Sequence, residues 1–205
     1  MQKLAIGGSV AIIALIAGTY LATQVLAPAD RFAACAAGQV AGGDIGGPFT
    51  LVDATGATVT DAQVLTTPSI IYFGYTFCPD VCPLDNARNA DAVDLLAAQG
   101  ITATPIFITI DPDRDTPAIM ADYTDAMHDR MIGLTGSAAQ IAAASAAYRT
   151  YYNKRDGDPE FYFMDHSTFS YLMLPGLGFM DFFPREETAE SVASRTACFI
   201  AAAAN

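Results

Sequence analysis

One stretch of the sequence, residues 69–83, constrains the fold more than any other. Its first part, Ser69–Tyr75, is an apolar run rich in isoleucine and aromatic residues, which predicts a buried central strand. Cys78 and Cys82 follow a turn, and apolar residues recur at helical spacing after Pro83. The sequence therefore predicts a strand–turn–helix unit with a cysteine pair at the carboxyl end of the strand.

The position of this cysteine pair favours redox or soft-metal chemistry. The positive end of a helix dipole stabilises thiolates, and a spacing of four residues within a first helical turn would put both sulfurs on one face. Two thiolates are soft ligands that favour copper(I), with zinc as the competitor. The same pair could instead form a redox disulfide, as in Cys-x-x-Cys sites of the thioredoxin type, or a purely structural disulfide.

The chain has two histidines, and His166 is the one that could complete a metal site. His128 belongs to a polar helix end, where a surface role is expected. His166 belongs to a predicted loop between two predicted strands, next to Asp165, which could orient its ring. From this pattern alone, a structural histidine and a metal ligand are equally good interpretations.

The remaining pattern alternates strands with helices. Strands are predicted at Phe49–Asp53, Ala57–Val59, Thr104–Ile110, Met131–Leu134, Glu160–Met164, Ser170–Leu174 and Phe179–Phe183, and further helices from Pro117, from Ser137 towards Tyr148 and from Thr188 to Ala204. This order predicts an α/β fold with a mostly parallel central sheet and flanking helices. Functional groups are expected at the carboxyl edge of that sheet.

An uncharged apolar segment, Leu4–Ala27, precedes this domain. As a helix, about 23 residues reach roughly 34 Å, enough to cross a hydrocarbon core of about 30 Å. Lys3 and the acidic remainder favour a cytoplasmic amino end, and a cleaved signal peptide is the alternative. We therefore expect a transmembrane anchor at 1–27, a tether at 28–46 and a globular domain at 47–205.

In this interpretation the protein is a single-pass protein of the inner (cytoplasmic) membrane. Its domain lies on the periplasmic side, or on the intermembrane side in a mitochondrion. The formal net charge of −12 repels nucleic acid phosphates and anionic lipid surfaces. We therefore expect no nucleic acid partner, and membrane contact only through the N-terminal helix.

The two other cysteines, Cys35 and Cys198, are distant from the close pair and from each other. Cys35 precedes the predicted core and Cys198 lies in the last predicted helix. Because the predicted compartment is oxidising, we expect a structural disulfide between them.

Three motifs together resemble the Sco/SenC family of copper chaperones. The first is Tyr72–Pro83 (YFGYTFCPDVCP), the second is Thr109–Pro117 (TIDPDRDTP), and the third is Asp165-His166-Ser167, followed by Tyr171, Pro175-Gly176 and Phe179. They occur in the family's order and spacing from about Phe49 to Phe183. Leu84-Asp85 departs from the acidic-then-apolar pair expected after Pro83, which bears on partner contacts rather than on ligands.

The resemblance implies a thioredoxin-like fold and a copper site made by Cys78, Cys82 and His166. It implies that copper(I), with copper(II) as the alternative state, passes from a copper donor protein to the binuclear copper A centre in subunit II of cytochrome c oxidase. Asp111 falls in the second motif, so a supporting role near the site is expected of it, as it is of Asp165. The family is one of metallochaperones, so the resemblance favours a protein that is not an enzyme.

Two other functions stay open: an exported thiol–disulfide oxidoreductase that reduces the oxidase cysteine pair, and a redox or copper sensor. A histidine ligand on its own loop favours the chaperone, because disulfide exchange needs no histidine there. No proline occurs between Asp165 and Thr168, where a thioredoxin-like oxidoreductase would place its cis-proline. In the chaperone, His166 is the ligand expected to swing away, and a Cys78–Cys82 disulfide would abolish binding.

Overall fold

The structure, a computed structural model, describes residues 15–16, 18–19, 31–36, 45–158 and 160–204. The chain divides into two units, residues 1–34 and residues 35–205. The predicted membrane anchor at 1–27 falls almost entirely outside the described residues, and so does part of the predicted tether at 28–46. Within the described ranges, no helix is long and apolar enough to cross a membrane.

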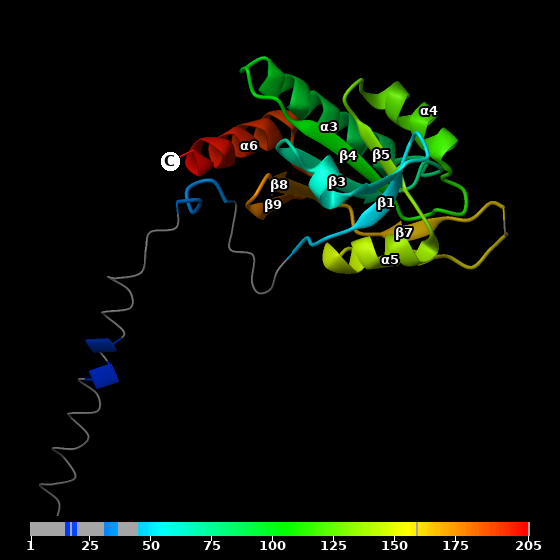
Figure 1. Cartoon of the computed structure of the whole chain (residues 1–205), viewed down its shortest axis with the longest axis horizontal. Coiled ribbons are helices and arrows are strands. Elements are labelled where there is room, and N and C mark those ends of the chain that lie inside the picture. Colours follow the sequence, from blue (N-terminus) through cyan, green and yellow to red (C-terminus); the bar gives the residue numbers. More distant parts are fainter. Residues whose placement is uncertain (1–14, 17, 20–30, 37–44, 159, 205) are drawn as a thin grey trace, which may run out of the picture. The chain divides into compact units, whose positions relative to one another are not determined.

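The second unit is built on a seven-stranded sheet with the strand order β2-β1-β5-β4-β3-β8-β9 (Figure 1). Its strands are β1 (Thr50–Asp53), β2 (Thr58–Thr60), β3 (Ser69–Gly74), β4 (Thr104–Thr109), β5 (Ile132–Thr135), β8 (Ser170–Leu174) and β9 (Gly178–Phe183). Only β3–β4 and β4–β5 are parallel neighbours, and the other pairings in this sheet are antiparallel. The expectation of a mostly parallel sheet is therefore wrong. The sheet is mixed, because the short turns of β1–β2 and β8–β9 can join only antiparallel strands.

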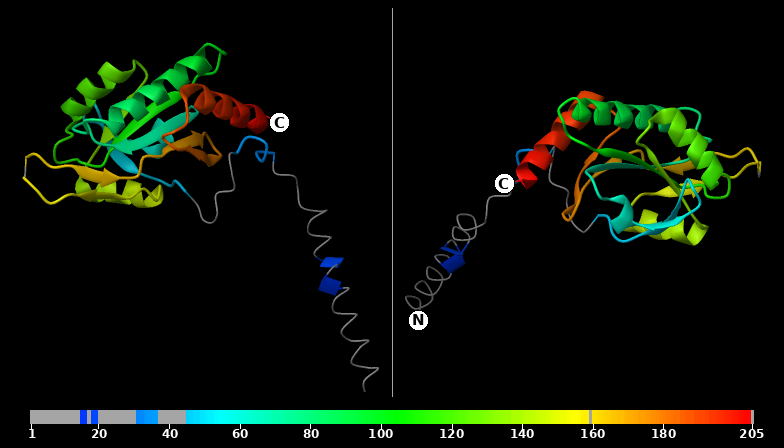
Figure 2. Two further views of the ribbon diagram at one scale, coloured as in Figure 1. Left: turned by 180° about the vertical axis from the view of Figure 1, so that it is seen from behind. Right: turned by 45° about the horizontal axis from the view of Figure 1, so that its top comes forward.

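Helices cover both faces of this sheet (Figures 1 and 2). They are α2 (Asp61–Val64), α3 (Val81–Ala97), α4 (Pro117–Met127), α5 (Ala138–Ala147) and α6 (Ala189–Ala203). Helix α6 packs beside α3, and α5 covers the opposite face. Helices α4, α5 and α6 start where the sequence predicts. Their caps, Thr116, Ser137 and Thr188, each accept a hydrogen bond from a backbone N–H of the first turn.

Strand β3 is the centre of the core, as its apolar sequence predicts. All six of its residues are buried, since β4 and β8 pair with its two edges and helices cover its faces. The ring of Phe73 packs on the rings of Tyr148 and Tyr171, at centroid distances of 5.4 and 6.0 Å. The loop that carries Cys78 and leads to Cys82 therefore starts from a buried, well-packed strand.

The main departure from the sequence prediction lies between α5 and β8. Residues 160–163 form no strand. Instead β6 (Tyr152–Lys154) pairs antiparallel with β7 (Met164–His166) in a separate two-stranded sheet. We call residues 152–166 the arm. A strand was predicted for its apolar run at 160–164, of which Phe161 and Phe163 are exposed while Tyr162 and Met164 are buried.

Cys35 and Cys198 form a disulfide, with a Cα–Cα distance of 5.6 Å. This bond ties the residues that precede β1 to helix α6. The chain-entropy relation gives about 5 kcal/mol of stabilisation for a loop this long.

Candidate metal centre

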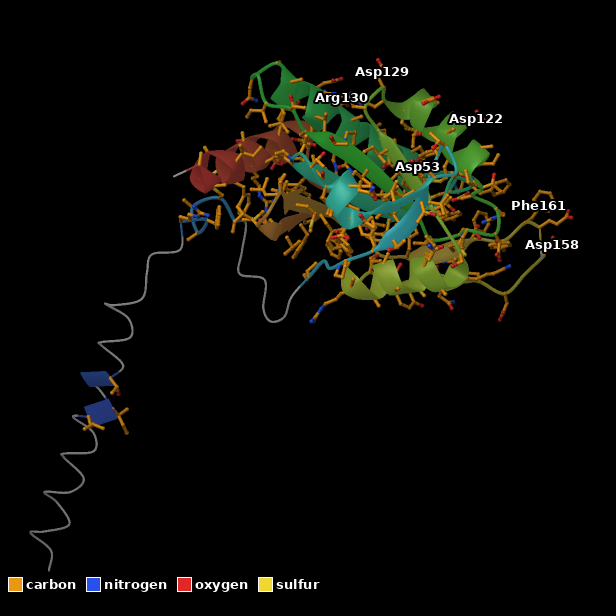
Figure 3. All side chains as sticks on the ribbon, in the orientation of Figure 1. Asp53, Asp122, Asp129, Arg130, Asp158 and Phe161 are labelled. Atoms are coloured by element: carbon orange, nitrogen blue, oxygen red, sulfur yellow. A yellow bond between two sulfur atoms is a disulfide. The ribbon has the colours of Figure 1, made fainter. Side chains whose placement is uncertain are left out.

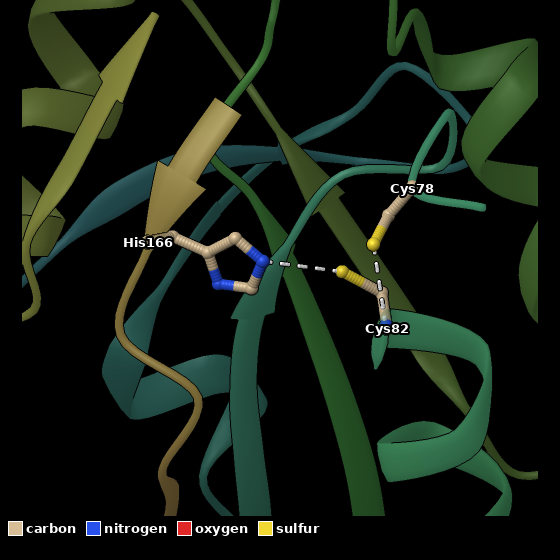
Figure 4. A group of neighbouring side chains, drawn as sticks. All are labelled: Cys78, Cys82 and His166. Atoms are coloured by element: carbon tan, nitrogen blue, oxygen red, sulfur yellow. Dashed lines mark hydrogen bonds between the residues drawn. The ribbon is translucent and has the colours of Figure 1, made fainter. Parts of the chain in front are cut away.

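Cys78, Cys82 and His166 converge at the carboxyl end of β3 (Figure 4). Cys78 lies in the loop that follows β3, Cys82 is the second residue of α3, and His166 is the last residue of β7. One ligand atom from each residue lies within 4.8 Å of the other two, and Cys82 Sγ lies 3.4 Å from His166 Nε2. Both cysteines are free and buried, and His166 is half-buried.

The two sulfurs come together differently from the prediction that both lie in one helical turn. Cys78 precedes the first residue of α3, Val81. The backbone N–H of Cys82 donates to Cys78 Sγ at 3.4 Å, and the N–H of Cys78 donates to the carbonyl of Tyr75 at 3.2 Å. The sulfur of Cys78 thus occupies the amino end of α3, where the helix dipole favours a negative charge.

The pKa values of the two thiols are shifted in opposite directions. The pKa of Cys78 is lowered by the hydrogen bond from the Cys82 thiol, by the neighbouring His166 ring and by backbone N–H groups that donate to its sulfur. The pKa of Cys82 is raised by its hydrogen bond to Cys78 and by burial. Cys78 is therefore the stronger acid of the pair and the residue that favours the thiolate form.

Gly74, at the end of β3, leaves the space that Cys82 fills. A Cβ atom on Gly74 would lie 2.9 Å from Cys82 Sγ, 2.9 Å from Phe107 Cε2 and 2.9 Å from Tyr72 Cε1. A real Cβ does not approach other atoms so closely, so a larger residue here would displace the cysteine or the two rings.

A backbone carbonyl, and not Asp165, orients the His166 ring. His166 Nδ1–H donates to the carbonyl of Ser167 at 2.8 Å, and because a carbonyl only accepts, Nδ1 carries the proton and Nε2 presents its lone pair to the sulfurs. Asp165 instead accepts from Arg155 at 2.7 Å, and this guanidinium lowers the pKa of the Asp165 carboxyl. The expected orienting role of Asp165 is not seen, because successive residues of a strand such as β7 point to opposite sides.

Asp111 is buried but does not contact the three candidate ligands through any hydrogen bond of the described residues. Its carboxylate accepts from Arg114 Nε at 2.5 Å and from the Tyr162 hydroxyl at 2.6 Å. It therefore connects the loop after β4 to the arm, and its role near the site stays a prediction.

Two further carboxylates support the cysteine pair, and neither was singled out from the sequence as a supporting residue. The Tyr72 hydroxyl donates to buried Asp85 at 2.9 Å. The Tyr72 side chain also interacts with Cys82, and its ring packs edge-on against His166 with the ring centroids 6.1 Å apart. Asp85 lies three residues after Cys82 in α3, a spacing that puts both on one helix face and could have identified it.

The second of these carboxylates is Asp115, which holds the start of the cysteine loop. Asp115 is fully buried and accepts from the N–H and hydroxyl of Thr76, at 3.0 and 2.5 Å, and from the Thr109 hydroxyl at 2.6 Å. Burial raises the pKa of this carboxyl. The site is thus held by residues from β3, β4, α3 and the arm.

Comparison with known proteins gives consistent matches over most of the chain. The SCO1/SenC family matches residues 37–201. Protein SenC of Rhodobacter capsulatus is 52% identical over 198 residues, which cover 96% of this chain and 89% of that protein. The mitochondrial SCO1 homolog 1 of Arabidopsis thaliana is 38% identical over 72% of this chain, but the match spans only 45% of that longer protein.

Solved structures agree with these matches. The crystal structure of Arabidopsis thaliana ScoI with copper bound has a TM-score of 0.73 and 35% identity, covering 77% of this chain and 99% of that one. Bradyrhizobium japonicum ScoI with copper bound has a TM-score of 0.68 and 37% identity, covering 75% of this chain and 98% of that one. The α/β thioredoxin-like fold that the motifs imply is confirmed, with a mixed sheet. The chain belongs to the SCO1/SenC family.

Proposed function

We propose that this chain is a copper metallochaperone that binds copper(I) through Cys78, Cys82 and His166 and delivers it to the binuclear copper A centre of cytochrome c oxidase subunit II. The observation that carries the proposal is the convergence of two sulfurs and one imidazole nitrogen within 4.8 Å. Relatives solved with copper bound share the fold and more than a third of the aligned sequence.

The donor set fits copper(I) better than zinc. Bonds of about 2.0–2.3 Å to nitrogen and sulfur put the three ligand atoms of a trigonal site roughly 4 Å apart, close to the separations seen here. Thiolates select soft copper(I), whereas structural zinc takes four ligands. Within the described residues, no histidine, cysteine or carboxylate adds a fourth ligand to this group of three.

Loading and release follow from the different environments of the ligands. Cys78 already offers a thiolate, His166 Nε2 a lone pair, and Cys82 loses its proton when the metal arrives. Cys82 is fully buried and Cys78 nearly so, while His166 is half-buried. An incoming thiolate or imidazole from a partner therefore reaches the metal from the His166 side, and a three-coordinate ion can accept it before any ligand leaves.

Exposed aromatic residues beside the site support a protein partner. Phe77, next to Cys78, is 51% exposed, and Phe161, on the arm, is 69% exposed. Their ring centroids lie 6.5 Å apart, and Figure 3 shows Phe161 projecting from the arm. The partners in the proposal are a copper donor protein and oxidase subunit II. An anchor at 1–27 and a tether at 28–46 would hold the domain 47–205 on the periplasmic or intermembrane side.

The acidity of Cys78 supports a second candidate function, that of a thiol–disulfide oxidoreductase acting on the oxidase cysteine pair. A thiolate stabilised at a helix amino end is the nucleophile in disulfide exchange. The same chemistry gates metal loading, because oxidation of the Cys78 thiolate and the Cys82 thiol to a disulfide removes two electrons and one proton and leaves no thiolate to bind copper. The metal site differs from the redox site in its need for His166.

A copper(I) competition titration of single variants tests the proposal. Cys78→Ser, Cys82→Ser and His166→Ala should each weaken binding by on the order of 100-fold or more, since second-sphere changes alone cost about 10- to 100-fold. His128→Ala is the control, because His128 contacts Asp94 and not the site. Unchanged affinity in all three ligand variants would contradict the proposal.

An insulin-type disulfide reduction assay on the same proteins separates the two functions. Fast reduction that survives His166→Ala, combined with weak copper(I) binding by the unmodified chain, would favour the oxidoreductase. Delivery itself is measured by the copper content of a subunit II soluble domain after incubation with the copper-loaded chain.

A further inference from the structure

Arg114 lies where three segments of the site meet: the cysteine loop after β3, the loop after β4, and the arm. Its guanidinium carbon lies 3.6 Å from the ring centroid of Tyr162 and 4.7 Å from that of Phe77. Its Nε donates to Asp111 at 2.5 Å, and an NH1 hydrogen to the carbonyl of Tyr162 at 3.1 Å. This one side chain therefore joins all three segments.

The residues that Arg114 contacts are neighbours of the candidate ligands and not the ligands themselves. Phe77 immediately precedes Cys78, and Tyr162 lies four residues before His166. Tyr162 is buried, and its hydroxyl donates to the same carboxylate, Asp111, that Arg114 binds. The connection between the cysteine loop and the arm thus consists of charge-assisted hydrogen bonds and a cation stacked on aromatic rings.

The arm depends on such anchoring for its position. Its strands β6 and β7 have three residues each and pair with each other, outside the seven-stranded sheet. An isolated two-stranded hairpin is marginally stable at best. Lys154, on β6, also lies 3.6 Å from the Tyr162 ring centroid. The Tyr162 ring therefore contacts a cation of the arm as well as Arg114.

We propose that Arg114 is a positioning residue that sets the place of His166 relative to the cysteine pair. It holds the arm against the cysteine loop through Tyr162 and Asp111, so that His166 Nε2 stays within reach of both sulfurs. The inference rests on the proposed copper function and adds to it the residue that fixes the third ligand. Loss of Arg114 leaves the cysteine pair intact and weakens copper(I) binding through His166 alone.

A double-mutant cycle tests this coupling. Arg114→Met should weaken copper(I) binding by about 10- to 100-fold in the unmodified chain and have almost no further effect in the His166→Ala background. Arg130→Met is the matched control, because Arg130 pairs with Asp94 at 3.6 Å and is far from the arm in Figure 3. Equal losses in both backgrounds, or unchanged affinity of Arg114→Met, would overturn the proposal.

A milder variant covers the case in which Arg114→Met does not fold. Tyr162→Phe removes only the hydroxyl that donates to Asp111. It should give a smaller loss of copper(I) affinity that also disappears in the His166→Ala background. A loss that persists in that background would overturn the proposal.

A copper-free readout separates this inference from the proposed function. In the metal-free protein, Arg114→Met should shift the His166 ring resonances in NMR spectra and speed amide exchange at the β6–β7 pairs, while Arg130→Met changes neither. The reduction potential of the Cys78–Cys82 disulfide should be the same in Arg114→Met as in the unmodified chain. If the unmodified chain does not bind copper(I), the proposed function fails while this readout still decides the positioning role. Unchanged His166 resonances would reject that role.

Discussion

Replacing Gly74 with alanine should disturb the core and the metal centre together. The added Cβ would lie 2.9 Å from each of three side-chain atoms, which belong to Cys82, Phe107 and Tyr72. All three residues are fully buried, so none of them can turn into solvent to make room. The backbone of β3 is held as well, because it pairs with β4 and β8 on its two edges.

The size of the effect follows from overpacking. Inserting one carbon into a well-packed core typically costs about 1–3 kcal/mol, and three simultaneous contacts below 3.0 Å put Gly74→Ala near the upper end. For a domain of this size, about 3 kcal/mol lowers the melting temperature by roughly 6–12 °C. Copper(I) affinity should fall too, because the added carbon displaces Cys82 Sγ from the position in which it contacts His166.

The assay compares Gly74→Ala with Gly157→Ala in urea unfolding and in copper(I) titration. Gly157 lies in the arm, and a Cβ there would meet no atom within 4 Å, so its substitution should change neither quantity. The reasoning is refuted if Gly74→Ala unfolds at the same urea concentration as the unmodified domain. A loss of stability with unchanged copper(I) affinity would refute the link to Cys82.

Three other changes have expected outcomes. Cys35→Ser should lower the free energy of unfolding by up to about 5 kcal/mol in non-reducing urea titrations, and reduction should then have little further effect on that variant. Because the pKa of Cys78 is lowered, its thiolate persists as the pH falls. Its alkylation by iodoacetamide at pH 6 should therefore stay close to the rate at pH 8, whereas an ordinary thiol slows by on the order of 100-fold. Asp115→Ala leaves one N–H and two hydroxyls unpaired and should cost on the order of 3 kcal/mol in thermal unfolding. A matching decrease for Asp113→Ala, an exposed carboxylate of the same loop, would contradict the role of Asp115.

Local patterns were enough to predict the central unit of the fold. The apolar run at 69–75 produced β3, and the helical periodicity after Pro83 produced α3, because both elements pack on the same core. The starts of α4 and α5 were also predicted, since a threonine or serine cap bonds to N–H groups within its own helix. Strand direction depends on contacts distant in the sequence, so the mixed sheet could not be predicted from these patterns.

The arm shows why an apolar run is an incomplete signal. Phe161 and Phe163 alternate with Tyr162 and Met164, and only the second pair is buried. The partner strand, Tyr152–Lys154, is short and polar, so its sequence does not predict a strand. With β7 recognised, its alternation would have placed Asp165 and His166 on opposite sides. The expected orienting role of Asp165 would then have been rejected from the sequence.

The supports of the three candidate ligands differ, and in the proposed chaperone this difference favours release that begins at His166. Cys82 starts a helix that packs on the core, and Cys78 is bound to that helix by the N–H of Cys82. His166 ends a short strand outside the main sheet, so fewer backbone hydrogen bonds hold it than hold the residues of the central strands. The histidine that the sequence placed on a loop thus lies at the end of a strand of the arm. Since the Cys78–Cys82 pair is complete without the arm, redox chemistry needs only the core, whereas tight metal binding needs the core and the arm together.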